Sequence, residues 1–426
     1  IGAGMSGLAA ALRLALHGKR VVVLEKHELW GGLNSFYTLR GRPFDVGLHA
    51  LTNFVRPGTP QAKGAPLMRL LRALRIRHEE LRLVEQDVSE IVFPRARLSF
   101  ANDFALLESE VARLFPSQRD GFARLTQLMR AYELDEEHPP PPSARALLER
   151  HLSEPLLREM LLLPVLLYGS AREDDTDEQT FAILFRALFL EGLSRPAGGI
   201  RTLLNLLIRR LKQAGVELRL SAGVQRVLLA DGRARGVVLE SGEELAAPLV
   251  LSCAGRVETL ALAGRPSAPA DEGRLSFLES IWILDRPAHA LGHRAATSFY
   301  SLEERCRYRR PEGLIDARTG VLSSGDNFGA ASGPEGELRL TVPANHPAWR
   351  ALTPEQYAAA KERCADEVAA AVVEARVTGD FRARRVFRDV FTPATIERFT
   401  GHRGGAVYGS PTISLGLMAR LGVPVG

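Results

Sequence analysis

The chain opens with Ile1-Gly2-Ala3-Gly4-Met5-Ser6-Gly7, in which three glycines have the spacing Gly-x-Gly-x-x-Gly. This spacing is typical of the turn between the first strand and the first helix of a dinucleotide-binding domain. Glycines there permit a tight turn, a close approach of a diphosphate to the backbone and close packing of the helix on the strand. Free N–H groups at the start of the helix would then bind the phosphates.

The residues that follow this turn strengthen the assignment. Apolar residues at helical spacing predict a helix from Ser6 to about His17, and Gly18 would end it. A buried strand is predicted over Val21–Glu25 because four of its five residues are apolar. Its last residue, Glu25, can accept hydrogen bonds from the hydroxyls of a ribose. The alternative is a structural turn that binds no nucleotide.

Length and composition fit a globular protein of two or three domains. The 426 residues are 46% hydrophobic and 25% charged, with a net charge of +5 at pH 7. This mild, dispersed basic charge suits anionic cofactors or lipid headgroups, and we expect no nucleic-acid partner. Cys253, Cys306 and Cys364 have neither metal-ligand nor disulfide spacing, so we expect no metal site and a reducing, cytoplasmic location. No apolar run reaches the roughly 18 residues of a membrane-spanning helix.

Helical and strand-like patterns alternate along the rest of the chain. Residues from about 65 to 190 are predicted to be mostly helical, with a rigid proline connector over Pro139–Pro142. Asp231-Gly232 is typical of a β-hairpin turn. Further helices are predicted over 200–214 and 353–377, and strands over 91–93, 97–100, 216–220, 224–229, 235–240, 248–252, 280–284, 320–323 and 337–342.

Two short motifs resemble the start of the FAD-dependent amine oxidase and phytoene desaturase superfamily. Glu25-Lys26 is followed by a second glycine pair at Gly31-Gly32, and Phe44-Asp45-x-Gly47 comes after it. Other segments are similar to the phytoene desaturase pattern, or to carotenoid isomerase-like proteins and retinol saturases; they are 195–200, 215–218, 224–227, 252–255, 391–397 and 404–409.

The resemblance implies an α/β fold. A discontinuous Rossmann-type FAD-binding domain would carry an inserted α+β substrate domain with a mixed sheet and a helical cap. The FAD domain would comprise residues 1–65, 195–265 and 390–426, and the substrate domain residues 66–194 and 266–389. The implied reaction is desaturation, saturation or isomerisation of a lipophilic polyisoprenoid or carotenoid, by hydride transfer between a substrate carbon and flavin N5.

The expected FAD site combines the glycine turn with residues that the resemblance implies. In the family, the second glycine loop approaches the flavin, the residue matching Val224 meets the adenine through its backbone, and a strand returns beneath the cofactor. The family usually continues the glycine pair with Arg, whereas Leu33 and Asn34 follow here. The full set of expected FAD-binding residues is Gly2, Ala3, Gly4, Met5, Ser6, Gly7, Glu25, Lys26, Gly31, Gly32, Leu33, Asn34, Val224, Cys253, Ala254 and Gly255.

The sequence assigns no catalytic residue. His49 follows the Phe-Asp-x-Gly motif and is a candidate proton donor near the flavin, although a packed histidine is more common at such a position. Tyr408 has the same two interpretations. The basic helix around Met68–Arg77 would contact an anionic membrane surface or be an ordinary amphipathic helix. The apolar residues 155–168 would line a lipophilic tunnel or form a core helix.

Two other protein classes stay open. An amine or protoporphyrinogen oxidase would share the fold, but few lysines and 7% aromatic residues give no sign of an amine-binding cage. A non-enzymatic, prenyl-binding protein of the Rab GDP-dissociation inhibitor type would also share it. The intact glycine turn with Glu25 argues against that class, since a chain that binds no FAD need not keep this turn.

Both ends of the sequence look incomplete. Only Ile1 precedes the glycine turn, where a strand of about five residues is normal. The last family motif, which contacts the pyrimidine edge of the flavin, is not found before Gly426. We therefore expect residues 1–426 alone to be unstable and to retain FAD poorly.

Overall fold

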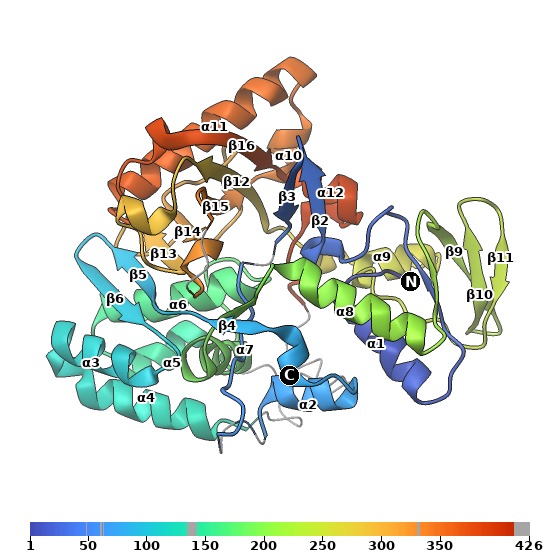
Figure 1. Ribbon diagram of the computed structural model, residues 1–426, viewed down its shortest axis with the longest axis horizontal. Helices are drawn as coiled ribbons and strands as arrows, with labels where there is room; N and C mark the ends of the chain where they lie inside the picture. Colours follow the sequence, from blue (N-terminus) through green and yellow to red (C-terminus); the bar gives the residue numbers. More distant parts are fainter. Residues whose placement is uncertain (48, 60–61, 63, 134–142, 330–332, 413–426) are drawn as a thin grey trace.

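The computed structural model describes residues 1–47, 49–59, 62, 64–133, 143–329 and 333–412. The proline connector predicted over Pro139–Pro142, and residues 413–426 of the expected FAD domain, lie outside this part of the chain. Figure 1 shows two halves side by side. The half at the right contains the N-terminus, and the half at the left is built on a large sheet.

The N-terminal residues and β1 (Val22–Leu24) lie at the centre of the first half. After the glycine turn comes α1 (Met5–Leu16), as predicted, and β1 pairs in parallel with β8 (Glu217–Arg219). On its other side, β1 receives a 2.8 Å hydrogen bond from the Gly2 N–H to the Leu24 carbonyl. This arrangement is the start of the parallel sheet that is typical of dinucleotide-binding domains.

The strand predicted over 248–252 is not formed. The carbonyl of Leu251 and the N–H of Cys253 both bond to Ile1, at 2.7 and 2.9 Å, but no regular ladder follows. Two backbone hydrogen bonds to a single residue do not define a strand. As a result Leu249 and Leu251 are 71% and 48% exposed, where we predicted a buried strand.

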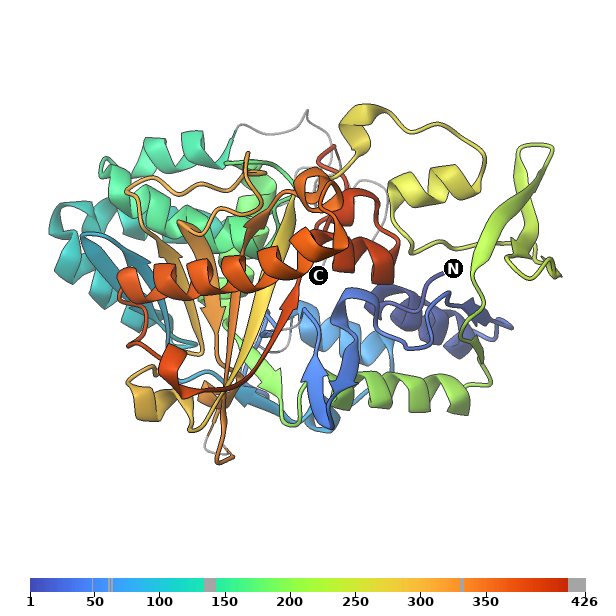
Figure 2. The same ribbon diagram turned by 90° about the horizontal axis from the view of Figure 1, so that it is seen from above.

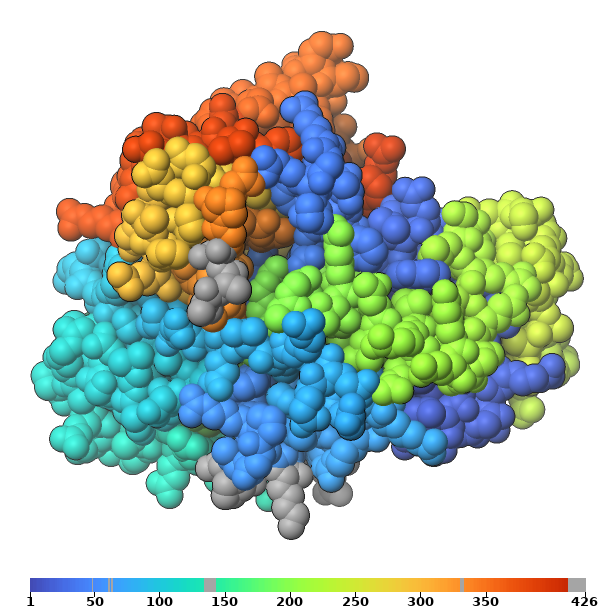
Figure 3. All heavy atoms as spheres, in the orientation of Figure 1, coloured from blue at the N-terminus to red at the C-terminus, as the bar shows by residue number. Residues whose placement is uncertain are grey.

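Three helices share the core of the first half. α8 (Ile200–Gln213) packs on α1, and α2 (Pro66–Ala73) joins them. Each helix contributes one apolar side, and the members of this core include Leu8, Leu12, Leu71, Leu74, Leu203, Leu204, Leu207 and Leu211. Figure 3 shows α2 and α8 on adjacent parts of one face of the molecule.

A three-stranded antiparallel sheet forms the outer end of this half, beside α9 (Arg256–Leu262) (Figure 1). Its strands are β9 (Val224–Ala230), β10 (Arg233–Leu239) and β11 (Glu244–Ala246). The hairpin predicted at Asp231-Gly232 is confirmed, since both residues have positive φ angles, 52° and 72°. Such a turn matches the twist of the flanking strands.

A seven-stranded mixed sheet organises the second half. Its order is β16-β12-β15-β14-β13-β5-β6, and all pairs are antiparallel except the parallel pair of β13 with β5. The bounds are β5 (Ser89–Phe93), β6 (Ala96–Phe100), β12 (Ser276–Leu284), β13 (Thr297–Ser301), β14 (Thr319–Ser323), β15 (Gly336–Ala344) and β16 (Arg385–Phe391). The predicted strands of this region are therefore confirmed.

Helices cover both faces of the large sheet. On one face lies α11 (Pro354–Glu374), the helix predicted over 353–377, which Thr353 caps, and Figure 2 shows it crossing the strands. The other face carries the helical cap: α3 (Phe104–Leu114), α4 (Arg119–Ala131), α5 (Ala144–His151), α6 (Pro155–Gly169) and α7 (Glu178–Phe185). α6 is buried on nearly every side, so it is a core helix of the cap.

Short elements join the two halves. They are the hairpin of β2 (Phe36–Leu39) with β3 (Arg42–Asp45), the pair of β4 (Leu83–Glu85) with β7 (Ser194–Pro196), and the helices α10 (His346–Arg350) and α12 (Pro393–Thr400). Across the described ranges, no helix combines the length and apolar character needed to cross a membrane.

Candidate functional site

The glycine turn is tightly closed on one side and open on the other. Gly2 has a φ of +94°, and a Cβ added to Gly7 would lie 2.1 Å from the Gly2 carbonyl oxygen. Neither position accepts a side chain without distortion. Gly4 is different, because its φ is −68° and a Cβ added there would have no neighbour within 4 Å. The turn therefore presents bare backbone to open space at Gly4.

The second glycine loop lies directly against this turn. The Gly31 N–H donates a 2.8 Å hydrogen bond to the Ala3 carbonyl, and Gly31 and Gly4 form a parallel bridge. A Cβ added to Gly32 would lie 3.4 Å from the Gly4 Cα. Two loops that are separated in sequence thus combine into one surface of backbone without side chains.

Glu25 borders this surface at the end of β1. Its Oε2 accepts a hydrogen bond from the Ala3 N–H at 2.7 Å, and its Oε1 accepts one from the His27 N–H at 2.9 Å. An ionised carboxylate has about four acceptor positions, so one remains on each oxygen. The half-buried Glu25 can therefore fix the glycine turn and still accept hydrogen bonds from a ligand.

Most of the other predicted residues surround the same turn. Cys253 and Ala254 lie beneath it, since a Cβ added to Gly2 would contact their backbone at 3.6–3.8 Å. Gly255, with a φ of +104°, directly precedes α9. Val224 begins β9, two residues after Ala222, whose N–H donates to the Glu25 carbonyl at 2.8 Å. Burial raises the pKa of the Cys253 thiol, which favours its neutral form.

Three predicted residues have other surroundings. The Lys26 ammonium lies against Gly401, which follows α12. Leu33 and Asn34 belong to a short 3₁₀ helix, η1 (Gly32–Asn34). The Leu33 carbonyl lies where a side chain at Gly47 would have to be, because an added Cβ would approach it to 2.2 Å.

A buried ion pair between Asp45 and Arg195 joins the segment 44–47 to the segment 195–200. The Asp45 carboxylate accepts hydrogen bonds from Arg195 Nη2 at 2.8 Å and from the Ile200 N–H at 3.0 Å. Gly199 fits here only as glycine, since an added Cβ would lie 2.1 Å from Asp45 Oδ2. The side chains of Asp45 and Arg195 are only 9% and 14% exposed, so the pair lies in the interior.

A second buried cluster of charged side chains, Glu279 and Arg339, connects His49 to the large sheet. His49 Nε2 lies 3.1 Å from Glu279 Oε2, and Arg339 Nη1 lies 3.0 Å from Glu279 Oε1. Burial alone would raise the pKa of Glu279, but His49 and Arg339 outweigh it and lower this pKa to about 2. Neither Glu279 nor Arg339 was singled out from the sequence.

The two candidate catalytic residues have packed side chains. His49 has the hydrogen-bonded ring that was expected for a structural histidine. The Tyr408 hydroxyl donates to the Leu167 carbonyl, and its ring packs on Phe277 at 5.9 Å between centroids. Burial raises the pKa of Tyr408, so it stays protonated near neutral pH.

The fold and this double-glycine surface define a dinucleotide-binding flavoprotein. Residues 5–315 match the family described as "Flavin containing amine oxidoreductase", and the chain belongs to that family. It is a flavin-dependent oxidoreductase, and its cofactor is FAD.

Curated relatives match over much of the chain. Prolycopene isomerase 2, chloroplastic, from an Oncidium hybrid cultivar is 24% identical, over 95% of this chain and 74% of its own length. A phytoene desaturase from Cercospora nicotianae is 26% identical over 67% of this chain and 50% of its own length.

Solved structures show the same fold. An oxidoreductase from Methanosarcina mazei has a TM-score of 0.63 and 18% identity, covering 92% of this chain and 86% of its own. A triple mutant of putrescine oxidase has a TM-score of 0.60 and 16% identity, covering 99% of this chain and 97% of its own.

The residues present fit FAD. Open space at Gly4 admits a diphosphate, and the free acceptor positions of Glu25 suit a ribose. When bound, FAD supplies a ring that accepts or returns a hydride. The residues of this chain would hold the cofactor, exclude water from the ring and donate or accept protons near it.

Proposed function

We propose that this oxidoreductase acts on a lipophilic polyisoprenoid or carotenoid-like substrate by desaturation, saturation or isomerisation of its double bonds. The proposal is supported by the similarity to a prolycopene isomerase over 95% of the chain and to a phytoene desaturase over 67%. The structural observation that supports FAD as the cofactor is the parallel bridge between Gly4 and Gly31, which brings the two glycine loops together beside Glu25.

The proposed FAD contacts follow from this surface. The turn Gly2–Gly7 would bind the diphosphate through backbone N–H groups, and Gly31–Asn34 would continue the contact toward the flavin. Glu25 would bind the adenosine ribose, with Val224 and Cys253–Gly255 beside the adenosine. Lys26 has the weakest support among the proposed contacts because its ammonium lies against Gly401.

The proposed domain division follows the same residues. We propose that residues 1–65, 195–265 and 390–426 form the FAD domain, and that 66–194 and 266–389 form the substrate domain. The exception is α2 (Pro66–Ala73), which we assign to the FAD domain because its apolar side packs in one core with α1 and α8.

The substrate class can be tested by product analysis. The FAD-loaded, full-length protein is incubated with prolycopene, phytoene and putrescine in separate reactions, with FAD-free protein as the control. We expect a change in the number or geometry of double bonds in one of the polyenes, and only with FAD. Oxidation of putrescine with both polyenes unchanged would favour the amine oxidase class instead.

A Glu25→Ala variant is expected to weaken FAD binding by roughly 1–3 kcal/mol, because charge-assisted hydrogen bonds to the ribose are lost. Turnover at saturating FAD should change little. Titration with FAD measures the affinity, and the exposed neighbour Glu28→Ala serves as the control. A large loss of saturated turnover with unchanged FAD affinity would instead assign Glu25 to the chemistry.

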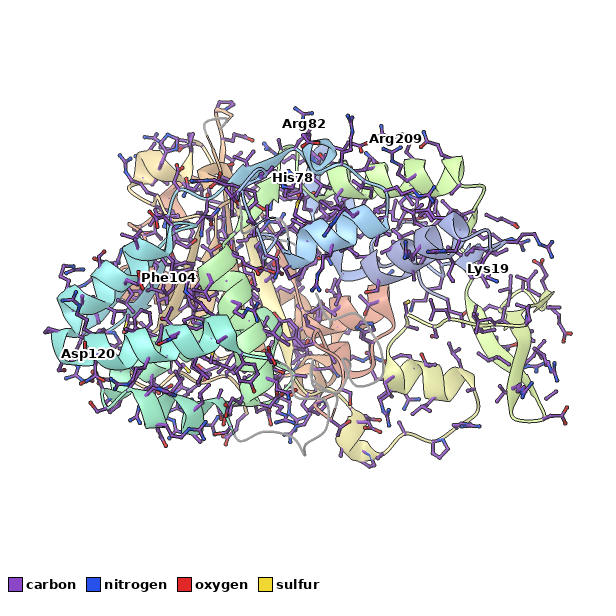
Figure 4. All side chains as sticks on the ribbon, turned by 90° about the horizontal axis from the view of Figure 1, so that it is seen from below. Lys19, His78, Arg82, Phe104, Asp120 and Arg209 are labelled. Atoms are coloured by element: carbon purple, nitrogen blue, oxygen red, sulfur yellow. The ribbon has the colours of Figure 1, made fainter. Side chains whose placement is uncertain are left out.

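We further propose a cytoplasmic protein with peripheral membrane contact through α2. This helix exposes Leu70, at 47%, between the exposed Arg69 and Arg72. Two further arginines, Arg82 and Arg209, belong to other segments than α2, and Figure 4 shows them at one edge of the molecule, on the same side as His78. An apolar residue surrounded by basic ones is typical of surfaces that bind anionic lipids.

Vesicle flotation tests this contact. Wild-type protein should float with anionic vesicles at low salt and detach at high salt, because screening weakens the attraction of surface arginines to lipid headgroups. Leu70→Glu should reduce flotation at low salt. Attachment that persists at high salt and alkaline pH, or no attachment to any vesicle, would contradict peripheral contact.

A further inference from the structure

His49 lies at the boundary between the glycine loops and the large sheet. It follows Gly47 by two residues, and Gly47 packs on the carbonyl of Leu33 in the second glycine loop. The His49 carbonyl accepts a 3.0 Å hydrogen bond from Arg195 Nη1. Its ring reaches Glu279 on β12 of the large sheet. The imidazole is therefore held from both halves of the molecule.

The two nitrogens of this imidazole have different surroundings. Nε2 lies 3.1 Å from the Glu279 carboxylate, which accepts a hydrogen bond from an N–H at that position. Nδ1 is buried and has no hydrogen-bond partner among the residues that the structure describes. In the neutral ring, the proton is then placed on Nε2, and Nδ1 keeps a lone pair without a partner.

Besides His49, Arg339 and Thr341 also lower the pKa of Glu279 and keep it ionised. Arg339 Nη1 lies 3.0 Å from Oε1, and the Thr341 hydroxyl donates to Oε2 at 3.3 Å. Arg339 is 2% exposed and also pairs with Glu337 at 2.7 Å. An ionised carboxylate behind an imidazole orients the ring and stabilises its protonated form, as in other acid–base pairs.

The charges around His49 come from several elements. Glu279 on β12 faces its ring, and Arg195 on β7 faces its backbone. Behind these lie Asp45 on β3, which pairs with Arg195, and Arg339 and Glu337 on β15. Asp326, which follows β14, also acts on Arg195. Four carboxylates and two guanidinium groups thus lie on the elements around the ring, and Glu279 contacts it directly.

We propose that His49 exchanges a proton with the substrate during the redox reaction, with Glu279 as the residue that positions it. The proposal rests on the proposed function. In a desaturation, two C–H bonds on adjacent carbons break and a C=C bond forms. Bound FAD would supply the acceptor of the hydride with its electron pair, and His49 Nδ1 would take the remaining proton. In a saturation, the same groups act in reverse.

The first test needs no substrate. The reduction potential of the bound flavin is measured against pH between about pH 5 and pH 9, where a histidine titrates. Reduced flavin releases a proton of its own in this range, so the plot of every variant bends once. If reduction also strengthens the hold of His49 on a proton, the wild-type plot should contain a second bend, and this second bend should be absent in His49→Gln. His346→Gln is the matched control, because His346 forms a similar pair with Glu397 at 2.8 Å and should leave the second bend unchanged.

The second test uses the substrate identified by product analysis. Anaerobic flavin reduction by that substrate should slow about 100-fold or more in His49→Gln, with FAD affinity retained. The wild-type rate should rise with pH as the ring becomes neutral, and the variant rate should be independent of pH. Glu279→Gln should give a smaller loss.

These outcomes separate the two proposals. A wild-type plot without the second bend overturns the role of His49 even if His49→Gln fails to fold. A second bend that persists in a folded His49→Gln variant also overturns it, as does an unchanged rate of flavin reduction. If no polyene reacts but the second bend is present and depends on His49, the proposed substrate class fails and the proton-holding role of His49 stands.

Discussion

A Gly4→Val variant of the full-length protein is expected to fold normally and to lose FAD. The backbone at Gly4 has a φ of −68°, which any residue adopts, and a Cβ there meets no atom within 4 Å. The valine is thus tolerated by the protein itself but occupies the space that the diphosphate needs. We expect FAD binding to weaken by roughly 3 kcal/mol or more, a factor above about 100.

Flavin content after desalting measures this effect, and circular dichroism checks the fold. Gly64→Val is the matched control, because a Cβ added to Gly64 also meets no atom within 4 Å and lies far from the glycine loops in sequence. Wild-type flavin content in Gly4→Val would show that the diphosphate binds elsewhere.

An Asp45→Asn variant is expected to be strongly destabilised. The carboxylate neutralises Arg195 across 2.8 Å in the interior, where both side chains are at most 14% exposed. Removing one charge of a buried pair leaves the other without compensation, at a cost on the order of 3–5 kcal/mol. The asparagine keeps the shape and one acceptor for the Ile200 N–H, so the loss reports mainly on the charge.

Thermal unfolding checks this expectation. The Tm of Asp45→Asn should fall by roughly 5–10 °C. Asp231→Asn is the control, since the Asp231 side chain is 91% exposed in a hairpin turn that asparagine also tolerates, and its Tm should change little. Equal Tm values for the two variants would show that the Asp45–Arg195 pair contributes little to stability.

Local patterns predicted the parts of the site that depend on neighbouring residues. The glycine turn, α1, β1 and the hairpin at Asp231-Gly232 form as expected, because glycine spacing and apolar periodicity act over a few residues. The resemblance to a flavoprotein superfamily was confirmed by the family match. The assignment of individual FAD contacts stays a prediction.

Long-range contacts could not be derived in this way. Glu279 and Arg339 are sixty residues apart in sequence and meet only because β12 pairs with β15. A signal was present, however, since Glu279 and Arg339 lie in strands rich in apolar residues, and buried charges need partners. The prediction of a buried strand over 248–252 was wrong. Its apolar residues predicted burial, but among the described residues its hydrogen bonds to Ile1 do not extend into a ladder, and Leu249 and Leu251 are exposed.

Competition for the FAD site tests the central claim most directly. Flavin-free, full-length protein is titrated with FAD, and flavin fluorescence is followed with and without ADP. If the glycine turn and Glu25 hold the adenosine diphosphate half of the cofactor, one FAD binds per chain, ADP competes with it, and FMN binds far more weakly. FMN binding as tightly as FAD, with no competition from ADP, would contradict the account.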